Sequence, residues 1–243
     1  MRIRLRFSKT GKIRFSSHRD MARCWERALR RAELPVAITE GFSPRPKMHF
    51  GLALSTGHES LGEYLDVDLR EPEASAVDLG ALPERLTPFL PPGVEVEAVS
   101  TIERTEPSLQ EAVSVCTWVI ELPGTTPERL ETDVRSLLDA PTLLVTRERK
   151  GKLVTDDIRP GIVSLRVLGV TPPDAPEPGA VIEAELATQP RSVRPSELLA
   201  AFDPPRSEGR VCRTHQWIIT DGARREPLSV RATSRAPAEV GAR

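Results

Sequence analysis

"RFSSHRDMARCWERALRR", residues 14–31, places six arginines among eighteen residues of a chain whose formal net charge is only −1. Apolar residues recur in and just beyond it at helical spacing and fall within about 100° of one another; they are Met21, Trp25, Ala28, Leu29 and Ala32. Four arginines fall on the opposite side: Arg19, Arg23, Arg27 and Arg30. Ser17 and Asp20 have the spacing of an N-terminal cap. The stretch therefore predicts a helix that packs through one face and presents guanidinium groups on the other.

Charge is unevenly distributed along the chain. Residues 1–50 hold 13 Lys and Arg against 4 Asp and Glu, a net charge of +9, whereas residues 51–243 hold 21 against 31, a net charge of −10. Arg2, Arg4 and Arg6 lie on the polar face of a predicted strand, which we expect to lie beside the helix and to add to this basic pole. A pole of this size attracts polyanions, whereas scattered surface charge does not.

The remaining pattern indicates an α+β protein. Strict alternation in "RIRLRF", residues 2–7, is typical of a half-buried strand. The order strand, helix, strand, strand, helix, strand follows, with a helix expected around residues 75–90, and the same order then recurs. We expect two ferredoxin-like βαββαβ units in tandem with antiparallel sheets, residues 1–106 and 107–222. The tail 223–243, rich in Ala, Arg, Pro and Ser, is expected to be disordered.

Cysteine spacing and short motifs give no sign of a metal or cofactor site. Cys24, Cys116 and Cys212 lie 92 and 96 residues apart, which fits neither a disulfide framework nor a CxxxCxxC cluster motif. The sequence contains no GxxxxGK[ST], GxGxxG or HExxH. We therefore expect no cofactor and no metal. No apolar stretch approaches the roughly 20 residues of a membrane span, so we expect a cytoplasmic protein with no membrane partner.

A second basic motif, "GFSPRPKM" at residues 41–48, joins an aromatic ring, two prolines and two cations. Prolines fix the backbone, so Arg45 and Lys47 would be presented at low entropic cost beside Phe42. Phosphate contacts combined with stacking on splayed bases are the way proteins recognise single-stranded RNA. The alternative interpretation is a rigid structural loop with Phe42 buried.

His18 is the candidate for chemistry. Ser17, His18 and Asp20 are no nucleophilic triad, because neighbours in one helical turn point in different directions. His18 falls at the edge of the apolar face, where it is a half-buried structural residue, a phosphate ligand or a general base. Glu63 is expected to neutralise an arginine of the helix or to meet a ligand's amine. For a cleaving site the sequence offers no second acid or base beyond Tyr64.

Three segments carry a likeness to known proteins: "RFSSHRDMARCWERALRRAELPV", "EGFSPRPKMHFGLAL" and "STGHESLGEYLDVDL". They resemble the radical-SAM-linked bacterial domain family of unknown function, in its stand-alone actinobacterial type. The resemblance implies an association with radical S-adenosylmethionine enzymes, or with the ribonucleases whose genes lie near those of stand-alone members. Many relatives have a histidine where this chain has Arg45, so a role for that histidine is not carried over. The expected architecture is also similar to that of repeat-associated RNA-binding proteins of CRISPR systems, some of which cleave RNA with a histidine.

Three functional hypotheses follow from these observations. The leading one is an accessory protein, without catalytic activity of its own, that binds structured RNA such as tRNA or rRNA. It would present the RNA to a modifying or processing enzyme, for example a radical SAM protein, through Arg19, Arg23, Arg27, Arg30, Phe42, Arg45 and Lys47. The second is a metal-free ribonuclease that uses His18. The third is a protein-interaction module that docks its basic face onto an acidic partner.

Overall fold

The structure, a computed structural model, describes residues 1–149 and 151–228. The first half contains β1 (Arg2–Lys9), the 3-10 helix η1 (Gly11–Phe15), α1 (His18–Arg31), β2 (Met48–Phe50), β3 (Glu59–Asp68), η2 (Glu73–Ala76), α2 (Leu82–Leu86), η3 (Thr87–Phe89) and β4 (Val96–Ile102). The second half contains α3 (Leu109–Ala112), β5 (Val115–Pro123), α4 (Pro127–Asp139), β6 (Leu144–Arg149), β7 (Lys152–Asp157), η4 (Arg159–Gly161), β8 (Ile162–Val170), β9 (Gly179–Ala187), α5 (Pro195–Ala200), β10 (Val211–Thr220) and β11 (Ala223–Arg225). None of the helices described is long and apolar enough to cross a membrane.

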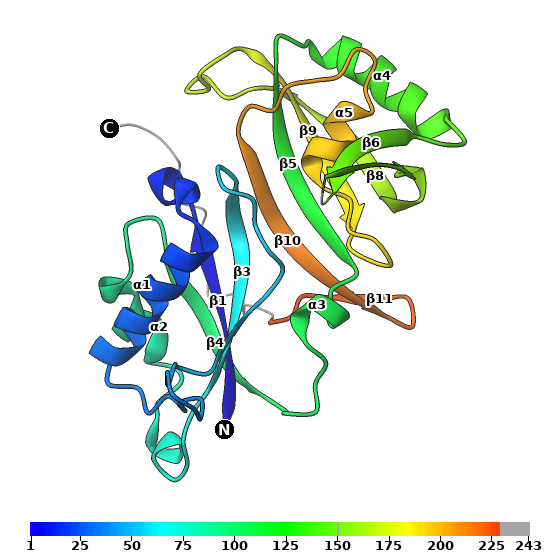
Figure 1. The fold of residues 1–243 in the computed structure, drawn as a ribbon. Coiled ribbons are helices and arrows are strands. Elements are labelled where there is room, and N and C mark those ends of the chain that lie inside the picture. Colours follow the sequence, from blue (N-terminus) through cyan, green and yellow to red (C-terminus); the bar gives the residue numbers. More distant parts are fainter. Residues whose placement is uncertain (150, 229–243) are drawn as a thin grey trace.

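Nine strands of the described chain form one sheet in the order β4-β1-β3-β10-β5-β9-β8, with β2 paired to β3 and β11 to β10. Every pairing in it is antiparallel except that of β3 with β10, where Cys212 lies opposite Glu59 and Arg213 opposite Ser60. Strands β6 and β7 form a separate hairpin. Figure 1 shows the two halves side by side, with α1 and α2 on the first and α4 and α5 on the second. The expected α+β class with mainly antiparallel strands is confirmed.

Helix α1 has the predicted phase. Met21, Trp25, Ala28 and Leu29 are buried, as is Ala32 just after the helix. They belong to one core with Ile3, Leu5 and Phe7, the apolar face of β1. Trp25 is fully buried, and its ring meets that of Phe7 edge-on with centroids 4.9 Å apart. The helical period of residues 21–32 and the alternation of residues 2–7 therefore produce two complementary apolar faces.

The polar face of β1 corrects one expectation. Its arginines face carboxylates across the sheet, because Arg2 pairs in register with Asp68 and Arg4 with Asp66. Each guanidinium Nε lies 2.7 Å from a carboxylate oxygen of its partner. Arg6 contacts Glu97 and Glu226 instead. Arg4 and Arg6 are buried and all three charges are compensated, so this strand adds nothing to an exposed basic pole.

The start of the C-terminal tail belongs to the fold. Strand β11 pairs with β10, and the Glu226 carboxylate accepts a hydrogen bond from Arg6 while the Pro227 carbonyl accepts one from Arg4. These contacts compensate cations that the sheet buries, which is a physical reason for order here. The boundary predicted at residue 223 therefore lies too early; the remaining tail, 229–243, lies outside the described residues.

The helix expected around residues 75–90 is broken into the short elements η2, α2 and η3. Pro83 and Pro88 each stand at the start of a new helical piece, where a missing backbone N–H costs nothing. Between η2 and α2 the chain turns at Gly80, whose N–H donates to the Asp78 carboxylate. The prolines therefore divide the single helix that the apolar pattern predicts into short helical pieces.

Replacing Trp25 by Ala should lower the free energy of unfolding by about 3 to 5 kcal/mol, because the ring fills the space between α1 and β1. The indole N–H has no hydrogen-bond partner among the described residues, so Trp25→Phe, which keeps an aromatic ring and removes this unsatisfied donor, should cost much less. Urea denaturation followed by circular dichroism measures both variants. Equal losses for Ala and Phe would contradict this account of the packing.

Candidate nucleic-acid interface and the adjoining cleft

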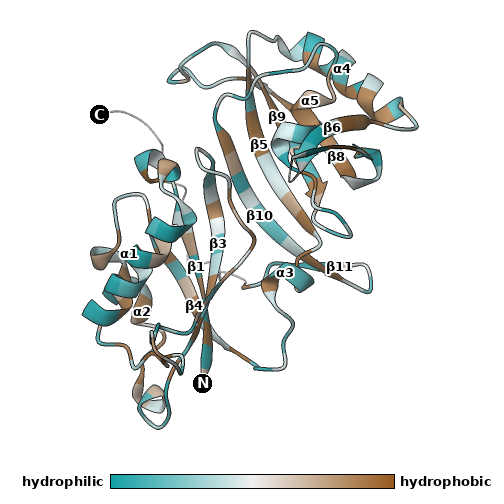
Figure 2. Ribbon diagram, viewed as in Figure 1, coloured by the Kyte–Doolittle hydropathy of each residue, from teal (hydrophilic) through white to brown (hydrophobic). Residues whose placement is uncertain are grey.

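The outward face of α1 carries five arginines. Ser17 caps the helix, its hydroxyl accepting the Asp20 backbone N–H at 3.2 Å, and the Ser17 hydroxyl donates back to the Asp20 carboxylate at 2.7 Å. These bonds to Ser17 lower the pKa of Asp20. Because the apolar stripe faces the sheet, the following arginines are exposed: Arg19, Arg23, Arg27, Arg30 and Arg31. Figure 2 shows hydrophilic residues along this helix.

These arginines are poorly compensated. Arg23 lies 3.7 Å from Asp20 in an exposed ion pair, an arrangement worth little in water. Among the residues that the structure describes, the Arg27 side chain donates only to the Cys24 sulfur, at 3.3 Å. The side chains of Arg19, Arg30 and Arg31 have no ion-pair or hydrogen-bond partner within the part of the chain that the structure describes. The four predicted arginines of the helix are therefore brought together on one exposed, positively charged face.

The loop carrying the second basic motif leaves α1 and returns to β2. Two backbone bonds close its base, from Thr39 N–H to the Arg45 carbonyl at 2.8 Å and from Lys47 N–H to the Ala37 carbonyl at 2.8 Å. Phe42 stands at its tip with a relative exposure of 110%, as open as an isolated residue. The alternative of a buried Phe42 is therefore wrong. Arg45 is exposed and Lys47 is half-buried.

His18 is the first residue of α1 and is exposed. Its ring meets the Phe50 ring edge-on, with centroids 4.8 Å apart. Both rings line a cleft of about 580 Å³ between β2 and residues 106–110. His49 lines the same cleft, with Nε2 3.9 Å from an Asp68 oxygen. His49 was not predicted as a site residue. It stands next to Phe50 in the sequence, but this would have indicated a place near His18 only if the packing of β2 against α1 had been known.

The inner end of the cleft contains buried charges. A smaller cavity of about 40 Å³ is lined by His18, Phe50, Lys9 and Glu63 among others. Glu63 accepts hydrogen bonds from Nη2 and Nε of Arg213 at 2.6 and 3.2 Å. Glu63 does neutralise an arginine, but the arginine belongs to β10 and not to the helix, since β3 and β10 pair at this point. Glu63, one member of this ion pair, lines the cavity.

Tyr64 is unsuited to acid or base chemistry in this cleft. Its side chain is buried in the core of the second half, and its hydroxyl has no hydrogen-bond partner among the described residues. Burial raises the pKa of this hydroxyl further above its ordinary value. The second acid or base that the sequence offered to a ribonuclease is therefore out of reach, whereas His49 is within the same cleft as His18.

The cysteines are free thiols in separate places. Burial raises the pKa of Cys116 to about 11 and that of Cys212 to about 12, which keeps both protonated near neutral pH. Over residues 1–149 and 151–228, no three His, Cys, Asp or Glu side chains gather as a metal site would require.

Comparison with known proteins places the chain in a family. A family model described as an uncharacterized protein conserved in bacteria (DUF2344) matches residues 2–195, a range that includes α1, the loop after it and the whole lining of the cleft. No curated protein matches the chain. The match covers more than half of the chain, so the resemblance to an uncharacterised bacterial family is confirmed. The chain belongs to the bacterial family DUF2344.

Proposed function

We propose that this protein binds structured RNA, such as tRNA or rRNA, through the exposed arginine face of α1 and presents it to a modifying or processing enzyme. The observation that carries the proposal is a contrast among arginines. Those of β1 are each matched to a carboxylate in the fold, whereas Arg19, Arg30 and Arg31 on α1 face solvent with no carboxylate partner among the described residues. Unmatched guanidinium groups on one helix face suit a polyanion, because each phosphate contact releases bound counterions.

The loop at residues 39–47 supports RNA as the ligand, because it adds an exposed aromatic ring to the positive charges. A fully exposed phenylalanine gains nothing from folding, and an aromatic ring beside cations is the usual means of stacking an unpaired base. Arg45 and Lys47 would then contact the neighbouring phosphates. Such pairing of a ring with cations favours RNA that offers splayed bases in loops or ends.

The partner enzyme is part of the proposal. The radical SAM association implied by the resemblance supplies one class of partner, and RNA-processing nucleases supply another. In our interpretation the strand orders β4-β1-β3-β2 and β10-β5-β9-β8 represent two ferredoxin-like units in tandem. The second unit, which lacks the arginine face, is then the natural surface for the enzyme.

Charge reversal of Arg19, Arg23 and Arg30 to Glu should leave folding intact, since all three are exposed, and should weaken RNA binding by several factors of ten at moderate salt. If three phosphate contacts are lost, the slope of log K against log salt should fall by about 2 to 3. Reversal of Arg104, Arg135 and Arg225, exposed elsewhere, gives the same net charge and serves as control. Equal RNA affinity of the two variants in a filter-binding titration would end this proposal. If the α1 variant alone then lost binding to an acidic protein, the protein-docking hypothesis would be favoured instead.

Phe42→Ala should leave the melting temperature unchanged because the ring makes no buried contact. Loss of one stacked base costs about 1 to 3 kcal/mol, or about 5- to 150-fold in affinity, and should affect RNA with unpaired bases more than duplex RNA. Phe42→Tyr keeps a stacking ring and should bind normally. The measurement is fluorescence anisotropy with matched hairpin and duplex RNAs, and identical losses for both RNAs would count against stacking.

The ribonuclease alternative gains one observation, since His18 and His49 line one cleft. We expect the wild-type protein to leave labelled tRNA and rRNA fragments uncut in the absence of metal ions, because acid–base cleavage needs two groups acting together. His18 packs against the Phe50 ring and His49 lies near Asp68, and no contact between the two histidines is seen within the described residues. Gel electrophoresis after incubation tests this. Specific bands that vanish with His18→Ala and with His49→Ala, at unchanged affinity, would reverse the choice, since a general base acts on the transition state more than on bound substrate.

A further inference from the structure

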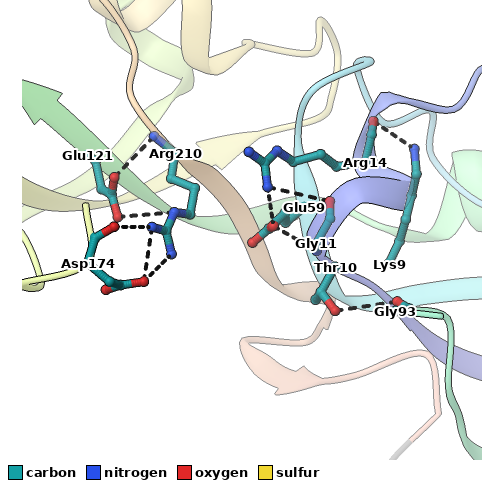
Figure 3. A network of polar contacts seen from close by, with 9 residues as sticks. All are labelled: Lys9, Thr10, Gly11, Arg14, Glu59, Gly93, Glu121, Asp174 and Arg210. Carbon is teal, nitrogen blue, oxygen red and sulfur yellow. Dashed lines mark hydrogen bonds and ion pairs between the residues drawn. The ribbon is translucent and has the colours of Figure 1, made fainter. Parts of the chain in front are cut away.

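Lys9, the last residue of β1, is a buried amine with weak protein partners. The residue is 5% exposed. Its Nζ donates to two backbone carbonyls, those of Arg14 at 3.4 Å and Ser16 at 3.3 Å, and both distances are long for a charged donor. Figure 3 shows the side chain reaching toward the Arg14 carbonyl. Lysine is almost never fully buried unless it is paired with an anion.

Two carboxylates of β3, the strand paired with β1, bind other cations. Glu59 accepts hydrogen bonds from the Arg14 guanidinium at 3.0 Å and from the Gly11 N–H at 2.9 Å (Figure 3). Glu63 binds Arg213, whose side chain is fully buried. Within the described chain no carboxylate oxygen lies within 4.0 Å of Lys9. The group of Lys9, Glu63 and Arg213 therefore buries two positive charges against one negative charge.

Such an excess of buried positive charge is unfavourable unless something compensates it. Desolvation lowers the pKa of Lys9, and Arg213 lowers it further while Glu63 opposes both. The amine also lines the cavity of about 40 Å³ at the inner end of the cleft, beside His18 and Glu63. That cavity has room for about three waters, which is comparable with the oxygen atoms of one phosphate group.

The small cavity adjoins the cleft of about 580 Å³, because His18, Phe50, Gly51 and Ala53 line both. The outer part has the mixed lining of a small-molecule site. Met48, Phe50 and Leu109 supply apolar surface, while His49 and Gln110 supply polar groups. The carboxylates in its lining, Asp66 and Glu106, share Arg4 as an ion-pair partner, and the Arg2 cation also lines the cleft.

We propose that this cleft binds a nucleoside phosphate, with the phosphate group at the inner end against Lys9 and His18 and the planar base in the outer part beside Phe50 and His49. The phosphate supplies the negative charge that the buried group lacks, and the dimensions suit one nucleotide. The site does not depend on RNA binding by α1. Its ligand is either a free nucleotide or the phosphorylated end of an RNA chain, since both carry the same chemistry.

Lys9→Met tests the proposal. Methionine matches the length of the side chain and removes the charge, so the ligand-free variant should melt at the same temperature as the wild type or higher. Wild-type protein should be stabilised by adenosine or guanosine monophosphate and by inorganic phosphate at higher concentration, and not by the nucleosides. The variant should bind the monophosphates at least tenfold more weakly, measured by isothermal titration calorimetry, whereas Lys12→Met, at an exposed lysine, should bind normally.

Two further measurements keep the outcome decisive. His18→Asn, at an exposed position where folding is safe, should weaken nucleotide binding several-fold whether or not the Lys9 variant folds. The variant with Arg19, Arg23 and Arg30 reversed should retain mononucleotide binding. Failure of the cleft proposal can therefore be distinguished from failure of the α1 proposal. Tighter binding of phosphate-ended than of hydroxyl-ended RNA, lost in Lys9→Met, would identify an RNA end as the source. Absence of any monophosphate binding by wild type at millimolar concentration, or unchanged binding by Lys9→Met, would overturn the proposal.

Discussion

Glu63 of β3 and Arg213 of β10 form the buried ion pair on which the joining of the two halves depends. The strands that carry them pair in parallel over a short register, with Cys212 and Arg213 opposite Glu59 and Ser60. Arg213 also donates to the Leu52 carbonyl at 2.9 Å and lies over the Trp118 ring at 5.3 Å. Removing one member of a buried pair commonly costs about 3 to 5 kcal/mol, because the other charge stays behind unpaired. One arginine thus contacts the first half through Glu63 and Leu52 and the second half through Trp118.

That ion pair also explains why Lys9 is left without a countercharge. Glu63 is the carboxylate whose field reaches Lys9 most strongly, yet it is bonded to Arg213. Elsewhere the fold matches its buried cations well, as Arg4 with Asp66 shows. The fold pairs its buried arginines with carboxylates. Among the described residues it leaves without such a partner one buried amine, that of Lys9 at a cavity, and most of the row of exposed guanidinium groups on α1. Both exceptions concern positive charge, and both lie in the basic first fifty residues.

Sequence alone predicted the elements whose periods are local. The phase of α1 followed from the spacing of Met21, Trp25 and Leu29, and the burial of Ile3, Leu5 and Phe7 followed from strict alternation. The expectations that proved wrong depended on contacts between segments far apart in the sequence. The Arg4 partner Asp66 lies 62 residues away and the Arg6 partner Glu226 lies 220 residues away, and no local pattern reports such pairing. The cleft could not be predicted for the same reason, since β2, α1 and residues 106–110 meet there only in the fold.

In the proposed recognition of RNA, different groups would supply the affinity and the choice among RNAs. From His18 to Arg30 the helix axis rises about 18 Å, a length along which arginines can contact several phosphates. Phosphate contacts position a nucleic acid and carry no sequence information. In this proposal, the groups that would contact bases stand beyond both ends of this row: the cleft beside His18 at the helix start, and Phe42 in the loop that follows its last turn. Changes to the arginines should therefore weaken all RNAs alike, whereas changes at the cleft or at Phe42 should alter which RNA is preferred, because only there can a base be contacted.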